Sequence, residues 1–320
     1  MDAYLEENGY GASNSRKLMC LTGGWSFLGI HIARMLLGRG YSVRFAIPVT
    51  PEEAGSLMES EEALSGKLEI CQADLLDYRS VFGNINGCSG VFHVPAPCDH
   101  LDGLQEYPTD SIDYEVQSAL NVVEACAAAE SVKRLVFTSS VSAIVCGRRT
   151  GNLGDGEIMD EKCWTNPEFC REKKLWSPLA KTLSEKAVWA LSNDRDLNLV
   201  VVNPASVIGP QLSNPNSHTI LNQLKGSKAL QQNGISAICA YVDVEEAALA
   251  HVAAFECENA TGRYICLQRV FTEDEIKEVM WSSHMTSNYR LESLLHPEKP
   301  LNLSNEKFLK LKRQYSGELA

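Results

Sequence analysis

The segment near the start of the chain constrains the fold more than any other, because it predicts a strand, a tight turn, a helix and a second strand in close succession. Residues 18–21 form a short apolar run, a Thr-Gly-Gly turn follows at 22–24, and residues 30–39 carry apolar side chains at helical spacing. Residues 41–47 predict the second strand. Two strands joined through a helix run parallel, so a right-handed crossover is expected.

Strands and helices continue to alternate through the middle of the chain. Further strands are predicted at 67–72, 90–94, 135–138 and 199–203, and helices at 113–129 and 174–191. This order specifies an α/β fold with a Rossmann-type, doubly wound parallel sheet. After residue 204 the chain is richer in Pro and Asn, and shorter elements are predicted: helices at 220–230, 245–256 and 304–315, and strands at 238–241 and 263–266.

The pattern divides the chain into three parts. Residues 1–16 are rich in Gly, Ser and Asn and are expected to form a flexible leader. Residues 17–210 are expected to form the dinucleotide-binding Rossmann domain. Residues 211–320 are too interrupted for an independent core, so we expect a smaller substrate-facing lobe, packed on the first domain and partly interleaved with it.

Composition narrows the classes of function. The 320 residues are 44% hydrophobic and 22% charged, as in an ordinary soluble protein, and the formal charge of -12 argues against nucleic acid as a partner. The 11 cysteines lack a closely repeated pair, which indicates reduced thiols in the cytoplasm and no metal site. No apolar run reaches the roughly 18–20 residues that cross a membrane, and the N-terminus has no apolar core typical of a secretory signal. The expected partner is a small-molecule substrate, and the expected state is a monomer or homodimer.

The turn after the first predicted strand is a candidate cofactor site. A glycine turn that enters a helix lets backbone amides approach a pyrophosphate. The spacing T-G-x-x-G-x-x-G is nearly met, except that Ser26 replaces the middle glycine, where its hydroxymethyl either crowds the phosphate or donates a hydrogen bond to it. A plain turn without a ligand is the alternative. The candidate residues are Thr22, Gly23, Trp25, Ser26, Phe27, Leu28 and Gly29.

The predicted helix at 174–191 carries a polar stripe. Ser177, Lys181 and Glu185 are four residues apart, so an amine stands between a hydroxyl and a carboxylate on one side of the helix. This stripe is either a site of chemistry or an exposed Lys181–Glu185 ion pair, which contributes about 0.3–0.5 kcal/mol. The apolar stripe of the same helix consists of Leu179, Leu183, Ala187 and Leu191.

Several motifs occur in a fixed order along the chain. Besides the glycine turn they are Asp74-Leu75, FHVPAP at 92–97, VKRLVFTSS at 132–140, DEKCWTNPEFC at 160–170, VNPASVIGP at 202–210, YVDVEEAALAH at 241–251 and GRYIC at 262–266. From about residue 17 to residue 266 the chain resembles plant dihydroflavonol 4-reductases and cinnamoyl-CoA reductases, which are extended short-chain dehydrogenases. It looks most like the divergent cinnamoyl-CoA-reductase-like proteins that lack the catalytic tyrosine.

The resemblance implies roles for three residues in carbonyl reduction. Ser140 matches the serine that holds the carbonyl oxygen, and Lys181 matches the lysine that holds the nicotinamide ribose and lowers the pKa of the tyrosine. Ser177 stands where that tyrosine is expected, and an alcohol is a much weaker acid than a phenol. The alternatives are a strand-end hydroxyl that binds local backbone for Ser140, and a helix N-cap followed by Pro178 for Ser177.

The resemblance also implies NADP as the cofactor, with NAD as the alternative. Arg44 matches the family, but the arginine expected four residues later to bind the 2'-phosphate is Pro48, and no carboxylate stands there either. Further contacts are implied with the adenine by Asp74 and Leu75, with the ribose and phosphates by Val94, Pro95 and Ala96, and with the carboxamide by Pro204 and Val207. Each of these residues has an alternative role in packing alone.

The leading hypothesis is therefore an NADP-dependent reductase that acts on a phenylpropanoid-type or other small plant carbonyl or thioester substrate, without a catalytic tyrosine. Four residues are considered as replacement proton donors: His93, His100, His218 and Lys181. The competing hypothesis is a dinucleotide-binding protein without reductase activity, which acts as a sensor or partner subunit.

Overall fold

A seven-stranded parallel sheet forms the centre of the computed structural model, which describes residues 17–23, 26–48, 66–95, 104, 106–147, 158–209, 240–270 and 302–317. Its strands follow the order β3-β2-β1-β4-β5-β6-β9, and every neighbouring pair is parallel. The strands are β1 (Leu18–Thr22), β2 (Ser42–Ile47), β3 (Leu68–Gln72), β4 (Gly90–His93), β5 (Leu135–Thr138), β6 (Leu199–Pro204) and β9 (Gly262–Cys266).

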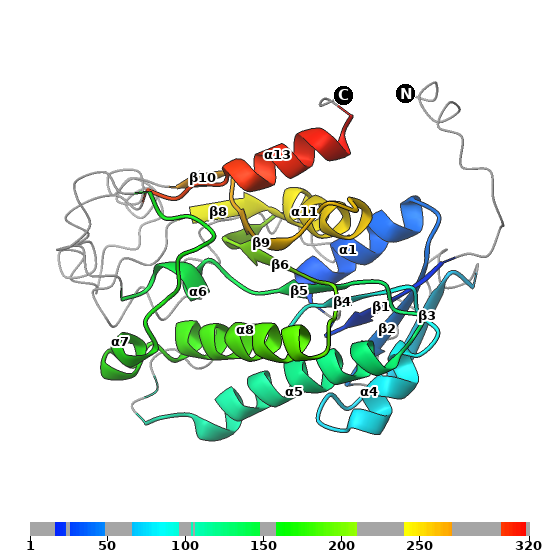
Figure 1. Cartoon of the computed structure of the whole chain (residues 1–320), viewed down its shortest axis with the longest axis horizontal. Helices are drawn as coiled ribbons and strands as arrows, with labels where there is room; N and C mark the ends of the chain where they lie inside the picture. Colours follow the sequence, from blue (N-terminus) through cyan, green and yellow to red (C-terminus); the bar gives the residue numbers. More distant parts are fainter. Residues whose placement is uncertain are drawn as a thin grey trace, which may run out of the picture.

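Helices cover both faces of this sheet (Figure 1). One face carries α4 (Tyr78–Ile85), α5 (Thr109–Ala128) and α8 (Trp176–Asp194). The other carries α1 (Phe27–Gly38) and α11 (Val244–Glu256), with α13 (Glu306–Tyr315) outside α11. The strand order reverses between β1 and β4, which is the topology of a doubly wound Rossmann fold. The predicted fold class is confirmed.

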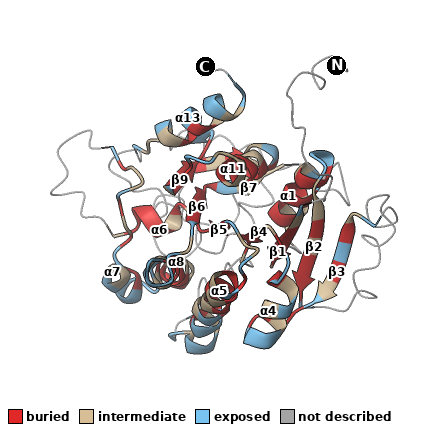
Figure 2. Cartoon of the chain, turned by 45° about the vertical axis from the view of Figure 1, so that its right-hand side comes forward, coloured by how far each residue is buried: buried red, intermediate tan, exposed pale blue. Residues whose placement is uncertain are grey.

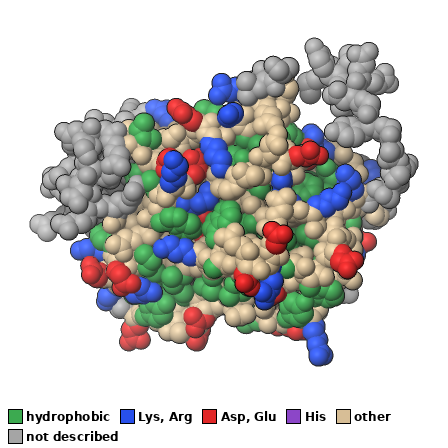
Figure 3. Space-filling model, in the orientation of Figure 1, with side chains coloured by type: hydrophobic (Ala, Val, Ile, Leu, Met, Phe, Trp, Pro, Cys, Tyr) green, Lys and Arg blue, Asp and Glu red, His purple; other side chains and the backbone are tan. Residues whose placement is uncertain are grey.

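The strands form where the sequence is continuously apolar, because both of their faces are covered. All residues of β4, β5 and β6 are buried, as Figure 2 shows by colour. Two apolar clusters result, of which one includes Phe45 and Phe92 and the other Val91 and Phe137. Charged side chains of both signs are interspersed over the outer surface in Figure 3. No helix in the described ranges is long and apolar enough to span a bilayer.

The C-terminal part of the chain enters the main sheet and also forms a second one. β9 lies beside β6 in the main sheet, and α11 packs on the same face as α1. The small sheet has the order β10-β8-β7 and consists of β7 (Ser206–Ile208), β8 (Ala240–Asp243) and β10 (Arg269–Val270). The leader at 1–16 and the helix predicted at 220–230 lie outside the described residues.

Most predicted elements are present, with shifts at their ends. The strand at 135–138 is found with the predicted bounds, whereas α1 and α5 begin three and four residues earlier than the predictions at 30 and 113. Three helices were not predicted: α4, α6 (Ser142–Val145) and α7 (Pro167–Glu172). All three are short, so helical periodicity has little length in which to emerge.

Candidate active site

The turn after β1 has a geometry that requires glycine. Gly23 has a φ of +70°, and a Cβ atom on it would lie 2.2 Å from the carbonyl oxygen of Val94. The backbone N–H of Val94 in turn donates to the carbonyl of Thr22 at 2.9 Å, so the ends of β1 and β4 are held close together. Since L-residues with side chains rarely adopt a positive φ, the backbone at this position favours glycine.

Ser26 caps the helix that follows this turn. Its backbone is extended, and its Oγ accepts a hydrogen bond from the N–H of Gly29 at 3.1 Å. The hydroxyl proton is therefore directed elsewhere, which fits donation to an anion at the helix N-terminus. Phe27 and Leu28 form the first turn of α1, while Trp25 lies outside the described residues.

Lys181 projects from α8 and forms an ion pair with Glu115 of α5. Lys181 Nζ lies 2.9 Å from Glu115 Oε1, and only 11% and 6% of the two side chains are exposed. The predicted exposed pair between Lys181 and Glu185 is wrong. Glu185 is fully buried against the sheet and pairs with Arg263 instead. The helix is rotated so that this stripe faces inward, where α5 and β9 supply the partners.

Ser177 lies inside the first turn of α8 and does not cap it. The helix begins at Trp176 and its N-cap residue is Leu175, with no side-chain cap bond, so the predicted cap at Ser177 is wrong. The buried Trp176 fixes this earlier start, because its Nε1 donates to the carbonyl of Leu104 at 2.9 Å. Ser177 is half-buried and stands one helical turn before Lys181, on the same side of α8.

Ser140 follows the end of β5 and is partly exposed. Its Oγ accepts a hydrogen bond from the N–H of Ser142 at 3.1 Å, and its carbonyl accepts one from Asn203 Nδ2 at 3.2 Å. The side chain therefore binds local backbone, as one of the two interpretations expects. Because that bond uses an oxygen lone pair, the O–H group remains chemically able to donate.

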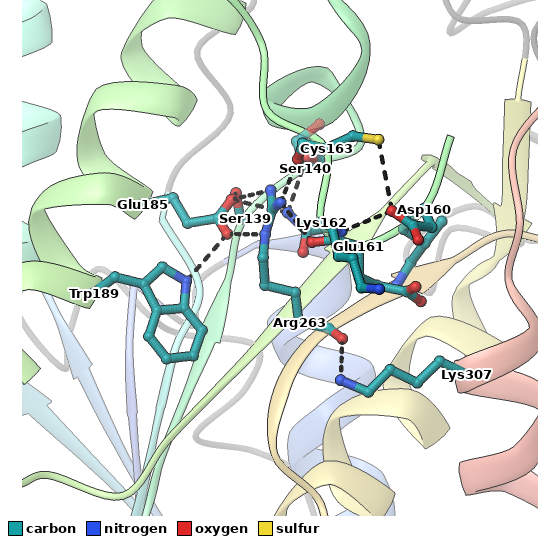
Figure 4. Close-up of polar contacts among 12 residues, drawn as sticks. Ser139, Ser140, Asp160, Glu161, Lys162, Cys163, Glu185, Trp189, Arg263 and Lys307 are labelled. Carbon is teal, nitrogen blue, oxygen red and sulfur yellow. Dashed lines mark hydrogen bonds and ion pairs between the residues drawn. The ribbon is translucent and has the colours of Figure 1, made fainter. Parts of the chain in front are cut away.

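Glu185 forms the centre of a buried polar cluster with side chains from β6, β9 and the end of β5 (Figure 4). Its carboxylate accepts hydrogen bonds from Arg263 Nε at 2.6 Å and Ser139 Oγ at 2.5 Å. It also accepts from Asn203 Nδ2 at 2.9 Å and from Trp189 Nε1 at 3.4 Å. One carboxylate thus ties α8 to three strands of the sheet.

Arg263 extends this cluster to the segment before α7. Its Nη1 donates to the carbonyls of Cys163 at 2.5 Å and Glu161 at 3.0 Å (Figure 4). Its guanidinium lies 3.9 Å from the ring centroid of Trp164. The half-buried Trp164 therefore forms a cation–π contact with Arg263. Lys307 Nζ donates to the carbonyl of Arg263 at 2.8 Å, which joins α13 to the same strand.

His93 is neutral and fully buried at the end of β4. Its Nδ1 lies 2.7 Å from Thr22 Oγ1, and its ring stacks on Phe137 with centroids 5.4 Å apart. Burial lowers the pKa of His93 to about 4. Its Nε2 has no hydrogen-bond partner among the described residues. His100 and His218 lie outside the described residues.

Arg44 lies within β2 rather than at its end. Its Nε donates to Glu69 Oε2 at 2.8 Å and its Nη1 to the carbonyl of Asn84 at 3.0 Å, so its guanidinium is engaged with β3 and α4. The hydrogen bond with Glu69 raises the pKa of Arg44 although desolvation opposes this. The residue directly after β2 is the exposed, uncharged Pro48.

Most of the remaining predicted residues lie at or just after the carboxyl ends of strands in the main sheet. Asp74 and Leu75 follow β3; Asp74 is exposed, and the carbonyl of the buried Leu75 accepts from Asn121 Nδ2 at 2.8 Å. Val94 is buried and Pro95 half-buried after β4, whereas Ala96 lies outside the described residues. Pro204 ends β6 and is buried, and Val207 is half-buried in β7.

The described residues fit the pyrophosphate of a dinucleotide. A positive-φ glycine, a capped helix N-terminus and a strand end meet at the switch point between β1 and β4, where doubly wound folds bind such ligands. Within the described ranges, no group of three or more His, Cys, Asp or Glu side chains could hold a metal ion.

Sequence reasoning missed Glu115 and the cluster around Glu185. A signal for Glu115 was present, because it falls in the buried stripe of α5 with Ile112, Ala119 and Val122, where an apolar residue is expected. Asn203 and Arg263 carried no comparable signal, since their partner is far away in sequence.

Comparison with known proteins agrees with this geometry. Residues 19–265 match the NAD dependent epimerase/dehydratase family. Cinnamoyl-CoA reductase 1 from Petunia hybrida is 32% identical over 309 residues, which cover 95% of this chain and 89% of that protein. Tetraketide alpha-pyrone reductase 2 from Arabidopsis thaliana is 35% identical over 280 residues, which cover 85% of this chain and 84% of that protein.

A solved structure has the same architecture. Vestitone reductase from alfalfa (Medicago sativa L.) superposes with a TM-score of 0.69 and 25% identity, and the match covers 92% of each chain. The family match spans most of the chain, and the relatives align over nearly their whole length. The chain therefore belongs to the NAD-dependent epimerase/dehydratase family of extended short-chain dehydrogenases, in the group of plant cinnamoyl-CoA reductases and dihydroflavonol reductases.

Proposed function

We propose that this protein is a reductase that uses NADPH in preference to NADH and transfers hydride to a small plant carbonyl or thioester substrate of the phenylpropanoid type. The observation that carries the proposal is the position of Lys181 and Ser140 at the same edge of the sheet as the glycine turn. The names of the relatives support a reductase, and the glycine turn with its capped helix supports a dinucleotide. A cytoplasmic location and a monomeric or homodimeric state are part of the same proposal.

The site residues have distinct roles in this proposal. When bound, the nicotinamide supplies a hydride to the carbonyl carbon. The Ser140 hydroxyl donates a hydrogen bond to the carbonyl oxygen, which gains the electron pair of the C=O π bond as the new C–H bond forms. The ammonium of Lys181 then gives a proton to this alkoxide oxygen, and solvent returns a proton to the amine.

Lys181 is a better proton donor than Ser177 and His93, the alternatives that lie among the described residues. Ser177 carries an aliphatic alcohol, which releases its proton far less readily than a phenol with a pKa near 10. His93 has a pKa of about 4 because of its burial, so it carries no transferable proton at neutral pH. An ammonium is charged at neutral pH and therefore carries a proton that it can transfer to an alkoxide.

The cofactor contacts are proposals of the same kind. Gly23, Ser26 and the first turn of α1 would hold the pyrophosphate, with Thr22 and Val94 beside them. Asp74 and Leu75 would flank the adenine, and Pro204 and Val207 the carboxamide. The preference for NADPH rests on the resemblance alone, since Arg44 is engaged with Glu69 and Pro48 carries no charge.

Titration and turnover test the proposal together. The purified chain is titrated with NADPH and NADH by fluorescence, and cofactor oxidation is then followed with cinnamoyl-CoA, dihydroflavonols and simple aldehydes. We expect tighter binding of NADPH and its oxidation with at least one of these carbonyls. Ser177 at the tyrosine position favours a second candidate, a dinucleotide-binding sensor or partner subunit; binding without oxidation of any substrate would favour it.

A further inference from the structure

The Glu115–Lys181 ion pair is unusual because both charges are withdrawn from solvent. The exposed fractions of 6% and 11% are small, and the atoms in contact are 2.9 Å apart. The carbonyl of Glu115 also accepts hydrogen bonds from the hydroxyls of Ser118 at 3.2 Å and Ser184 at 3.4 Å, so the backbone that bears the carboxylate is held from both helices.

The pair lies toward the carboxyl edge of the sheet. α5 and α8 each connect parallel strands, so both run opposite to the strands and begin at that edge. The carboxylate of Glu185 binds Ser139, which lies just after the end of β5. Lys181 precedes Glu185 by four residues, so at 1.5 Å per residue it lies about 6 Å from Glu185 along α8, in the direction in which the strands end. On α5, Asn121 binds the carbonyl of Leu75, which follows β3. Glu115 precedes Asn121 by six residues and therefore lies about 9 Å from it along α5, in the same direction.

A second ion pair also links α5 to α8. Glu124 and Arg195 form an exposed, bidentate ion pair between α5 and the end of α8, with distances of 3.0 and 2.7 Å. A buried ion pair contributes little to stability compared with apolar residues of the same size, since desolvation offsets the attraction. Stability alone therefore does not explain why the carboxylate of Glu115 is buried beside Lys181.

We propose that Glu115 is a positioning residue for Lys181, which keeps the ammonium charged and directed toward the end of β5, where Ser140 lies. This inference rests on the proposed function, in which the ammonium replaces the missing phenol as proton donor. A neighbouring carboxylate favours the charged form of an amine, whereas burial alone would disfavour it. The titratable groups that face Glu115 include Lys181 from α8 and His93 from β4, with Tyr114 beside it on α5.

The test measures the titration of Lys181 in the full chain. Wild type, Glu115→Gln and Glu124→Gln are labelled with acetic anhydride between pH 7 and pH 11, and the acetylation of Lys181 is quantified by peptide mass spectrometry. We expect the midpoint for Lys181 to fall by about one pH unit in Glu115→Gln, so that its labelling at pH 8 rises about tenfold. Glu124→Gln, which removes a carboxylate from the same helix and from another pair between α5 and α8, should leave the midpoint unchanged.

The outcomes separate this inference from the proposed function. An unchanged Lys181 midpoint in folded Glu115→Gln overturns the positioning role, even where turnover is lost. A shifted midpoint supports it, even where the wild type oxidises no cofactor with any carbonyl and the reductase proposal fails. If the wild type is active, kcat should fall about tenfold in Glu115→Gln while KM changes little. Far-UV circular dichroism checks folding, and Glu115→Asp, whose shorter carboxylate withdraws from the amine, replaces a Gln variant that does not fold.

Discussion

At position 177 the chain presents an aliphatic alcohol one helical turn before Lys181, inside the first turn of α8. If the rest of the site is intact, Ser177→Tyr should add a phenol whose pKa the neighbouring ammonium lowers. We expect this variant to increase cofactor oxidation by about 100-fold over the wild type, since a positioned general acid contributes roughly 10²–10⁴. The measurement is NADPH oxidation with the substrates named above.

Ser177→Phe is the matched control for this gain. It adds the same ring without the hydroxyl, so it should show no increase. Equal rates in the Tyr and Phe variants, both folded, would mean that the site lacks more than a proton donor, and would favour the sensor or partner-subunit hypothesis.

The contact with the cofactor ribose that the resemblance implies for Lys181 can be tested without turnover. Lys181→Ala removes a charged hydrogen-bond donor, and such bonds contribute roughly 1.5–3 kcal/mol. We therefore expect the dissociation constants of NADPH and NADH to rise about tenfold in fluorescence titrations. Lys186→Ala, which removes an exposed ammonium from the same helix, serves as the control. Unchanged affinity in Lys181→Ala would remove the assignment of this lysine.

At the scale of elements, the Glu185–Arg263 pair joins α8 to β9 inside the core. Arg263→Met should leave the Glu185 carboxylate buried without its cation, at a cost of about 3–5 kcal/mol in the free energy of unfolding. Urea unfolding measures this loss. Arg195→Met, which breaks the exposed pair with Glu124, should cost far less than Arg263→Met, because water screens the attraction between exposed charges.

A double variant separates the lost charge pair from lost packing. Glu185→Leu combined with Arg263→Met removes both buried charges, so it should be more stable than Arg263→Met alone. A double variant less stable than the single one would show that the hydrogen bonds to Ser139 and Asn203 outweigh the burial of the charge.

The elements themselves were largely predictable, whereas their polar partners were not. Strands such as β5 and β6 stand out because a parallel sheet covered on both faces requires continuous apolar runs. The partner of a charged residue depends on how each helix is rotated against its neighbours. Lys181 pairs with Glu115, 66 positions away, rather than with Glu185 one turn along, and no local pattern distinguishes these alternatives.

In the candidate site, too, local features were predictable and long-range contacts were not. The glycine turn was predictable because its constraint is local: Gly23 needs a positive φ and has no room for a side chain. Arg44 matched its motif in sequence, but three residues separate it from the end of β2, and only the register of the sheet reveals that it points to Glu69.

At the scale of the whole molecule, the strand order brings together the ends of β1, β4, β5 and β6, which come from separate parts of the sequence. The sheet is completed by β9, which reaches β6 through α11 and carries Arg263 into the cluster at Glu185. The C-terminal part of the chain therefore helps to hold α8, the helix that carries Lys181, against the sheet.

Two buried histidines near this centre make the folded state sensitive to acid. His93 at the end of β4 and His251 of α11 are fully buried, and desolvation lowers the pKa of each from 6.5 to about 4. His251 Nδ1 lies 2.7 Å from the carbonyl of Ala247 and its Nε2 lies 2.8 Å from Thr138 Oγ1, so the neutral ring satisfies both neighbours.

The direction of the pH effect follows from these lowered pKa values. Below pH 6.5 the two histidines are protonated in the unfolded chain, whereas in the folded chain they stay neutral down to about pH 4. Their contribution to the free energy of unfolding is therefore present above pH 6.5 and is lost progressively as the pH falls toward 4. Each histidine should remove about 1.5 kcal/mol from the free energy of unfolding between pH 6.5 and pH 5. Urea unfolding at pH 6.5, 5.75 and 5.0 measures the slope. His251→Gln, which keeps a donor and an acceptor but does not titrate, should reduce the loss by about half; the same slope in both proteins would show that His251 does not govern it.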